Sequence, residues 1–150
     1  PDIMTLAKPL AGGLPIGAIL MTEAVASAMH PGEHGTTFGG GAMVTAVAHH
    51  VVERISEPEF LAHVSEVGDY LIERLSELNS PLIKEVRGKG LMVALELVTD
   101  VSPVIEQGYE HGLLMVNAGT NVIRFVPPLI IEKSHVDTLI DRLTTIFAAL

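Results

Sequence analysis

The architecture of this 150-residue chain follows from residues 6–17, which read Leu6-Ala7-Lys8-Pro9-Leu10-Ala11-Gly12-Gly13-Leu14-Pro15-Ile16-Gly17. Glycine and proline at this density indicate tight turns and close approach of backbones rather than the interior of a helix. Lys8 is the only charged residue in the stretch. A lysine that is desolvated by apolar neighbours has a lowered pKa, so its amine can attack a carbonyl carbon. The stretch alone leaves a second interpretation open, a surface lysine between a strand and a turn.

A second glycine-rich stretch reads His34-Gly35-Thr36-Thr37-Phe38-Gly39-Gly40-Gly41 and precedes a predicted helix at 42–55. Adjacent hydroxyl and backbone N–H groups in such a turn can bind a phosphate. The stretch is not a Walker motif, because no Gly-Lys-Thr or Gly-Lys-Ser follows, and it lacks the spacing of a dinucleotide fingerprint. A lone glycine loop of this kind indicates a phosphate site only weakly.

The third feature is Val122-Ile123-Arg124-Phe125-Val126-Pro127-Pro128, in which Arg124 interrupts an otherwise apolar strand. The planar guanidinium group of an arginine can hold a carboxylate through two parallel hydrogen bonds. Taken alone, the pattern leaves an alternative open, an arginine that pairs with a buried aspartate or glutamate.

In this order, and with Val86-Arg87-Gly88-Lys89-Gly90-Leu91-Met92 between the second feature and the third, the chain resembles the class III aminotransferases. The resemblance extends over essentially the whole chain, and within the family it is nearest to the acetylornithine aminotransferases. It implies the α/β fold of the fold-type I transferases that depend on pyridoxal 5′-phosphate (PLP). Residues 1–65 would form the C-terminal portion of the large PLP-binding domain, and residues 66–150 the small C-terminal α+β domain.

The resemblance also implies a reaction, the PLP-dependent transfer of an amino group from N2-acetylornithine to 2-oxoglutarate in arginine biosynthesis. Ornithine, succinylornithine and 4-aminobutyrate aminotransferases stay open as alternatives, because they differ chiefly in pocket residues outside this chain. A further alternative is a non-catalytic folded fragment that only associates with other subunits.

The resemblance assigns roles to four residues. Lys8 matches the lysine that bonds to PLP as a Schiff base and then moves the substrate proton. Thr37 matches the threonine that binds the cofactor phosphate of the neighbouring subunit, which implies a homodimer with shared active sites. Thr36 matches the adjacent hydroxyl residue that contacts the substrate, and Arg124 matches the arginine that binds the substrate carboxylate.

The chain departs from the family pattern in one place and lacks several of its parts. The family usually continues Gly-Gly-Asn-Pro where this chain has Gly40-Gly41-Ala42, which changes the start of the following helix. The family's aspartate for the pyridine nitrogen, its phosphate turn and its stacked aromatic ring all lie upstream of the lysine. None is present here, and the chain opens on Pro1-Asp2. We therefore expect a fragment that is inactive by itself.

Composition narrows the class of protein further. With 48% apolar and 18% charged residues the chain predicts a packed core, and its net charge of −9 disfavours a nucleic-acid partner. No cysteine is present, and the histidines lack metal-ligand spacing, so we expect no metal site. No stretch reaches the ~18 consecutive apolar residues of a membrane span. These features are typical of an enzyme of the cytosol or of an organelle matrix.

Apolar periodicity predicts the elements of secondary structure. A buried strand is expected at 16–21, and after the helix at 42–55 we expect a long helix capped by Ser56 that ends before residues 79–81. Further strands are expected at 82–86, 91–97, 113–116 and 122–126, with a helix at 104–111. Ser134 is expected to cap the last helix.

Overall fold

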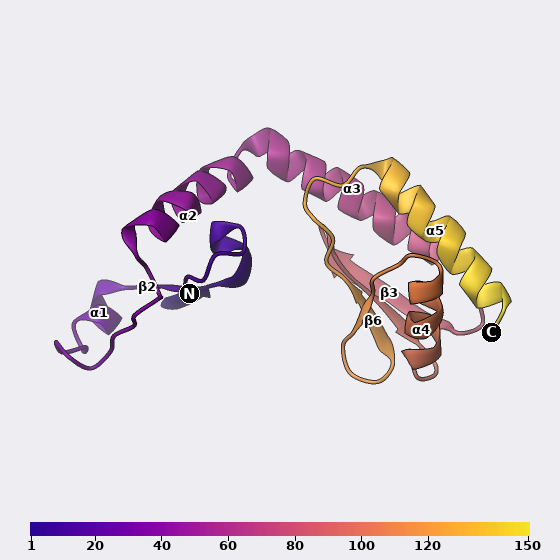
Figure 1. Ribbon diagram of the computed structural model, residues 1–150, viewed down its shortest axis with the longest axis horizontal. Coiled ribbons are helices and arrows are strands. Elements are labelled where there is room, and N and C mark those ends of the chain that lie inside the picture. The colour runs from indigo at the N-terminus through magenta and orange to yellow at the C-terminus, as the bar shows by residue number, and fades with distance from the viewer. The chain divides into compact units, whose positions relative to one another are not determined.

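The computed structural model describes residues 1–150 and divides into two compact units, Pro1–Phe60 (unit 1) and Leu61–Leu150 (unit 2). Figure 1 shows both, coloured along the chain. The division falls inside helix α3 (Pro58–Ser76), whereas the sequence predicts a domain boundary between residues 65 and 66 in the same helix. None of the helices has both the length and the apolar composition that crossing a bilayer requires.

Unit 1 is built around a two-stranded antiparallel sheet. Its elements are β1 (Ile3–Leu6), the 3-10 turn η1 (Lys8–Ala11), β2 (Ala18–Met21), α1 (Glu23–Ala26) and α2 (Ala42–Ile55). The predicted helix at 42–55 is confirmed, and β2 lies within the predicted strand. That strand was expected to be buried, which is wrong for this structure: Ile19 is 61% exposed and Leu20 52%. The reason is that the sheet has only two strands and no layer of unit 1 covers these side chains.

The junction between α2 and α3 differs from the prediction at Ser56. This residue ends α2, and its N–H group donates to the carbonyls of Val52 and Glu53. Helix α3 begins at Pro58 instead. Proline has no N–H group, and at the first position of a helix this costs no hydrogen bond, because the first N–H groups have no partner within the helix. The prediction that Ser56 caps α3 is therefore wrong.

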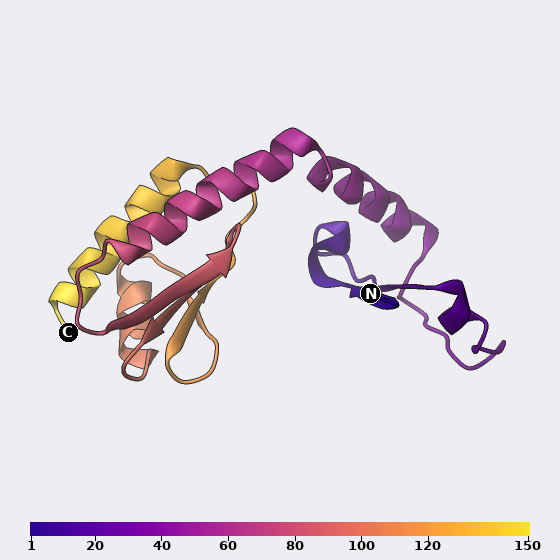
Figure 2. The ribbon, with the colours of Figure 1, turned by 180° about the vertical axis from the view of Figure 1, so that it is seen from behind.

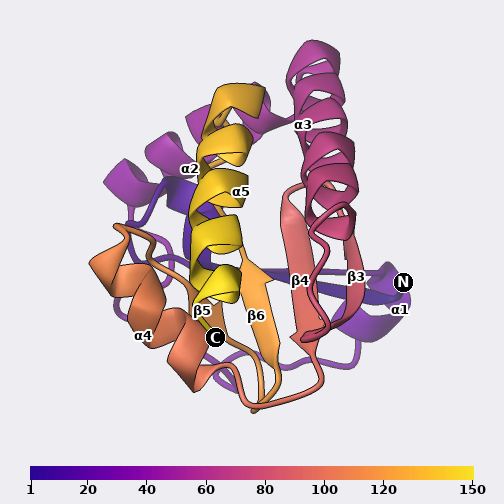
Figure 3. The ribbon, with the colours of Figure 1, turned by 90° about the vertical axis from the view of Figure 1, so that its right-hand side faces the viewer.

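Unit 2 is a four-stranded antiparallel sheet covered by helices. After α3 it contains β3 (Ile83–Lys89), β4 (Met92–Leu97), α4 (Ser102–Glu110), β5 (Val116–Asn117), β6 (Val122–Phe125) and α5 (Lys133–Ala148), with strand order β3-β4-β6-β5. Helices α3 and α5 lie side by side over one face of the sheet, as Figure 3 shows, and the view from behind agrees (Figure 2). We call the opposite side of this sheet the open face.

The core of unit 2 lies between the sheet and these helices. It gathers apolar side chains that alternate along β4 and β6 and recur every three or four residues along α3 and α5. The fully buried ones are Leu71, Leu75, Val93, Leu95, Leu97, Val101, Val104, Ile123, Val136, Leu143 and Ile146. Hydrogen bonds tie the two helices together at their outer surface, where Tyr70 and Arg74 both donate to the Asp137 carboxylate at 2.7 Å.

Most of the elements predicted for unit 2 are confirmed, with two corrections. The strand expected at 113–116 begins only at Val116, because α4 ends in a turn that uses the N–H group of Leu113: it donates to the Gly108 carbonyl at 2.7 Å. Gly112 makes this turn possible with φ +68°. The last helix begins at Lys133, so Ser134 lies inside its first turn. Glu132 precedes that turn, and its N–H group donates to His135 Nδ1 at 3.0 Å.

Two glycines let α3 approach the β3–β4 turn. A Cβ atom on Gly68 would lie 2.3 Å from the Gly90 carbonyl oxygen, and Gly90 itself has φ +53°. Any larger residue at position 68 would push the helix off the turn. Packing therefore requires Gly68, and the left-handed backbone favours glycine at position 90.

Candidate active site

Lys8 occupies a strained position at the start of η1. Its φ of +56° is the only positive value at a residue other than glycine. Such a backbone costs about 1–2 kcal/mol and is found most often at functional sites. The turn that follows is closed by the Gly12 N–H group, which donates to the Pro9 carbonyl at 2.9 Å. The local structure thus fixes the direction in which the lysine leaves the backbone.

The surroundings of Lys8 differ from the prediction. The sequence indicated a desolvated lysine, but its side chain is exposed and has no hydrogen-bond or ion-pair partner. The apolar residues of the stretch pack in the turn and do not surround the amine: Ala11 is 1% exposed, and η1 packs against α2. The Lys8 amine is consequently exposed and has no partner within this chain.

Thr36 and Thr37 lie in the exposed loop that leads into α2, and neither hydroxyl bonds to another residue. The loop folds back so closely that a Cβ atom on Gly39 would lie 2.3 Å from Thr36 Cγ2. Helix α2 begins at Ala42 with Gly41 before it, and no side chain caps its first N–H groups. The replacement of the family's Asn-Pro therefore leaves a helix start intact. Hydroxyl and N–H donors without partners favour an anion here.

The segment that carries Lys8 and the threonine loop meet within unit 1. They line a common hollow of about 320 Å³, formed by Leu14, Pro15, Thr37, Phe38, Gly41, Ala42, Met43 and Val44. Two apolar side chains of this hollow are strongly exposed, Phe38 at 76% and Met43 at 74%. The structure thus brings the end of the first sequence motif beside the second.

Arg124 lies on β6 in unit 2 and points to the open face, while its neighbours Ile123 and Phe125 are buried on the helix side. The residues opposite it, Ala94 on β4 and Val116 on β5, cannot form an ion pair. Every other arginine has a partner: Arg54 binds Glu57, Arg74 binds Asp137, Arg87 binds Glu85 and Glu96, and Arg142 binds the Gly112 carbonyl. No aspartate or glutamate of this chain therefore forms an ion pair with Arg124.

Beside Arg124 the surface of unit 2 is hollowed. The hollow measures about 380 Å³, and its walls are apolar apart from Arg124 and His135. Val116, Phe125 and Pro127 contribute to it near the arginine. A guanidinium group at the rim of an apolar hollow suits a carboxylate that carries an aliphatic chain.

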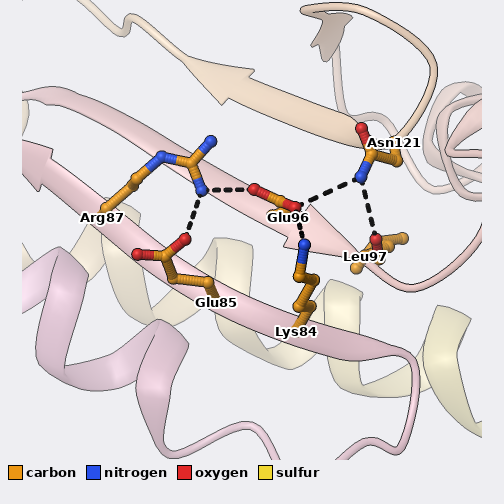
Figure 4. A network of polar contacts seen from close by, with 6 residues as sticks. All are labelled: Lys84, Glu85, Arg87, Glu96, Leu97 and Asn121. Atoms are coloured by element: carbon orange, nitrogen blue, oxygen red, sulfur yellow. Dashed lines mark hydrogen bonds and ion pairs between the residues drawn. The ribbon is translucent and has the colours of Figure 1, made fainter.

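The sequence did not indicate the group of charges that neighbours Arg124 on the open face. Glu96 accepts hydrogen bonds from Lys84 and Arg87, each at 2.6 Å (Figure 4). These two donors hold the pKa of Glu96 below its usual value, and the bond to Glu96 raises the pKa of Arg87. The only signal in the sequence is the single glutamate in the apolar run 91–97, and its partners depend on strand register.

Four predicted site residues are thus distributed over both units. Lys8, Thr36 and Thr37 belong to unit 1 and Arg124 to unit 2. No group of three or more histidine, aspartate or glutamate side chains gathers where it could hold a metal ion.

Comparison with known proteins supplies the family. The sequence model described as "Aminotransferase class-III" matches residues 1–147. A mitochondrial protein of Dictyostelium discoideum named probable acetylornithine aminotransferase is 51% identical over 93% of this chain and 32% of its own length. The mitochondrial acetylornithine aminotransferase of Alnus glutinosa is 49% identical over 100% of this chain and 34% of its own length. The chain spans about a third of the curated relatives that it matches.

Among solved structures, an ornithine aminotransferase of Toxoplasma gondii superposes with a TM-score of 0.88 at 30% identity, covering 99% of this chain and 37% of that one. Its title describes partial occupancy of PLP at the active site. The mixed helix and sheet architecture described above is therefore the one found in such enzymes.

Proposed function

Since the chain belongs to the class-III aminotransferase family, we propose that the whole protein is a PLP-dependent enzyme that transfers the amino group of N2-acetylornithine to 2-oxoglutarate. The observation that carries the proposal is Lys8, a strained, exposed lysine without a partner, in the same unit as a loop of uncommitted hydroxyl groups. The acetylornithine names of the relatives support the choice of amino donor.

The residues of unit 1 fit the reactive aldehyde of PLP and its anchoring phosphate. The unpaired Lys8 amine suits the aldehyde carbon of one PLP, and the hydroxyl of Thr37 with the uncapped N–H groups of α2 suits a PLP phosphate, which we assign below to a second copy. When bound, PLP would supply the electron sink for the negative charge on the substrate carbon that bears the transferred amino group, which is C5 in N2-acetylornithine. Lys8 Nζ then takes the proton from that carbon. The turn of η1 fixes the direction in which the Lys8 side chain leaves the backbone, and so the side from which the amine approaches.

Thr37 is proposed to serve the phosphate of a second copy of the protein. Phe38 and Met43, beside Thr37, expose 76% and 74% of their surface, and such apolar side chains favour a protein surface over water. A homodimer with shared active sites would cover them. Thr36, whose hydroxyl is also uncommitted, is proposed to contact the substrate.

Arg124 is proposed to bind a substrate carboxylate. N2-acetylornithine carries its free amine on C5, away from its carboxylate, whereas 2-oxoglutarate reacts at the carbon next to one of its carboxylates. Both substrates thus offer a carboxylate, so one arginine can serve both halves of the reaction. The residues opposite Arg124 on β4 and β5, Ala94 and Val116, are not acidic. Two N–H groups of the guanidinium group can therefore donate to a substrate carboxylate. The apolar hollow beside it would accommodate the aliphatic part of either substrate.

Ornithine is the second candidate donor, favoured by the likeness to the Toxoplasma gondii enzyme. Succinylornithine and 4-aminobutyrate fit the same four residues. The mitochondrial names of two relatives support an organelle matrix as one compartment, with the cytosol as the other. We also expect the 150-residue chain by itself to lack activity, since it contains no acidic partner for the pyridine nitrogen beside Lys8.

The experiment that tests the proposal is a comparison of amino donors. The whole protein, purified with PLP, is assayed with 2-oxoglutarate and each of N2-acetylornithine, ornithine, succinylornithine and 4-aminobutyrate. The highest kcat/KM is expected for N2-acetylornithine. A higher value for ornithine would replace the donor but keep the reaction class, whereas no transfer from any of them by PLP-loaded protein would overturn the proposal.

A further inference from the structure

A row of residues crosses the open face of unit 2 beside the proposed carboxylate site. Register places Arg87 on β3 opposite Ala94 on β4, and Ala94 opposite Arg124 on β6, which in turn lies opposite Val116 on β5. Two arginines thus lie on one face, two strands apart, with a small side chain between them. Only one of them, Arg87, is bound to acidic residues.

Glu96 is the acidic residue that could bind Arg124. It lies opposite Val122, two residues before Arg124 on β6, and therefore on the same face and diagonal to the arginine. Diagonal neighbours on adjacent strands are about 7–8 Å apart, within reach of long side chains. Yet the Glu96 carboxylate makes no contact with Arg124.

The reason is that both oxygens of Glu96 are already occupied. Lys84 Nζ donates to Oε1 at 2.6 Å, and Asn121 Nδ2 donates to the same oxygen at 3.3 Å. Arg87 Nη1 donates to Oε2 at 2.6 Å and to Glu85 Oε2 at 2.7 Å, so it holds this oxygen of Glu96 on the β3 side (Figure 4). Only 13% of the Glu96 side chain is exposed.

In a carboxylate with so little exposure, an oxygen without a hydrogen-bond donor is costly, even while Lys84 still binds the other oxygen. If Arg87 were lost, Oε2 of Glu96 would have no donor, and the nearest uncommitted cation on the open face is Arg124. The binding of Glu96 to Arg124 would then compete with a substrate carboxylate for the same guanidinium group.

We propose that Arg87 is a positioning residue that keeps the Glu96 carboxylate off Arg124 and so reserves Arg124 for the substrate. The inference rests on the proposed function, in which Arg124 binds the substrate carboxylate. Lys84, also on β3, acts in the same direction by holding the other oxygen of Glu96.

The test uses Arg87→Gln in the whole protein loaded with PLP. The KM values for amino donor and 2-oxoglutarate should both rise about two- to fivefold, the strength of one partly exposed ion pair, with kcat little changed. Binding of glutarate, which has carboxylates but no reacting carbonyl, should weaken by the same factor. Lys89→Gln, which removes a charge two residues further along β3, should leave these values unchanged.

A second substitution, added to Arg87→Gln, shows whether the rise in KM comes from Glu96 binding to Arg124 or from the change in net charge alone. Adding Glu96→Gln removes the competing carboxylate and should restore both KM values and glutarate binding. Adding Glu85→Gln restores the same net charge, but this residue lies on β3 and should not restore them. Equal rescue by both changes, or an unchanged KM in Arg87→Gln, would overturn the inference.

Two further variants keep the outcome interpretable. If Arg87→Gln does not fold, Lys84→Gln, at a position 59% exposed, should raise both KM values in the same direction and by less. An unchanged KM there would also count against the inference. Arg124→Lys tests the proposed function instead. If this variant leaves the KM of both substrates unchanged, Arg124 does not bind their carboxylate. If it raises both KM values strongly but Glu96→Gln does not restore them in Arg87→Gln, only the inference about Arg87 fails.

Discussion

Units 1 and 2 differ in where they place their apolar side chains. Unit 1 buries Ala11, Ala48 and Phe60, while the other buried apolar residues all belong to unit 2. Unit 1 exposes apolar residues on both faces of its sheet, among them Ile19 and Leu20. Unit 2 instead has a continuous core. The residues proposed to handle the cofactor thus lie where packing is sparse, and the residue proposed to bind the carboxylate lies on a rigid sheet.

This difference has a physical meaning. A strand exposed on both faces resembles one taken from a sheet that is covered on both sides, so unit 1 is suited to packing against more protein. Arg124 needs a fixed orientation to grip a planar carboxylate, and a strand of a packed sheet provides it. Changes in unit 1 should therefore affect chemistry more than stability, and changes in the core of unit 2 the reverse.

The largest effect is expected from Lys8→Ala in the whole protein. Without the amine, transamination should fall by at least about a thousandfold, while the thermal unfolding of unit 2 stays unchanged. Alanine keeps the Cβ atom that strains this position, so any change in stability cannot come from relief of strain. Activity within tenfold of the parent protein would show that the reactive lysine does not lie in unit 1 at Lys8.

A pair of substitutions tests stability in the two units. Leu95→Ala, at a fully buried position in the sheet of unit 2, should lower the free energy of unfolding by about 2–5 kcal/mol. Ile19→Ala, at a position 61% exposed in unit 1, should change it by roughly 0.5 kcal/mol or less. Denaturant unfolding of the 150-residue chain measures both. Equal losses would mean that unit 1 has a core of its own.

Arg124→Lys tests the proposed role of unit 2, the binding of the substrate carboxylate. Lysine keeps the charge but cannot form two parallel hydrogen bonds, so kcat/KM for both half-reactions should fall by about 2–4 kcal/mol, or roughly 30- to 1,000-fold. PLP affinity should barely change, because the arginine belongs to unit 2. A loss confined to PLP affinity would be the opposite result and would remove Arg124 from the substrate site.

Thr37→Ala should have a smaller effect on function than Lys8→Ala or Arg124→Lys. Loss of one charge-assisted hydrogen bond weakens PLP binding by about 1.5–3 kcal/mol, roughly ten- to a hundredfold. Mixing this variant with Lys8→Ala tests whether sites are shared between subunits. In a mixed dimer one site would then carry both changes and the other neither, so about one active site per dimer should return. No recovery after proven subunit exchange would argue against sharing.

The sequence predicted elements best where local preference and packing agree. Helix α2 was found at its predicted bounds because its run of alanine and valine contains no breaker. The helix start predicted at Ser56 was wrong because Pro58 fits the first position of a helix so well that α3 begins there. Strand β5 was mispredicted because the turn after α4 takes the N–H group of Leu113, which a strand would need.

The candidate site was predicted in part for a related reason. Lys8, Thr36, Thr37 and Arg124 lie in short motifs that can be recognised in order along the chain. The sequence left both a desolvated and a surface position open for Lys8, since its exposure depends on which way the apolar neighbours pack. The link between Arg87 and Glu96 was missed because they are nine residues apart in sequence and are joined only by the register of β3 with β4.

The assignment of the chemistry to unit 1 can be tested most directly by locating the lysine that bonds to the cofactor. The whole protein is loaded with PLP, reduced with borohydride, digested and mapped by mass spectrometry. The phosphopyridoxyl group is expected on Lys8 at one per chain, and it should disappear from that peptide in Lys8→Ala. A stoichiometric adduct on any other lysine of this chain, with Lys8 unmodified, would contradict the assignment.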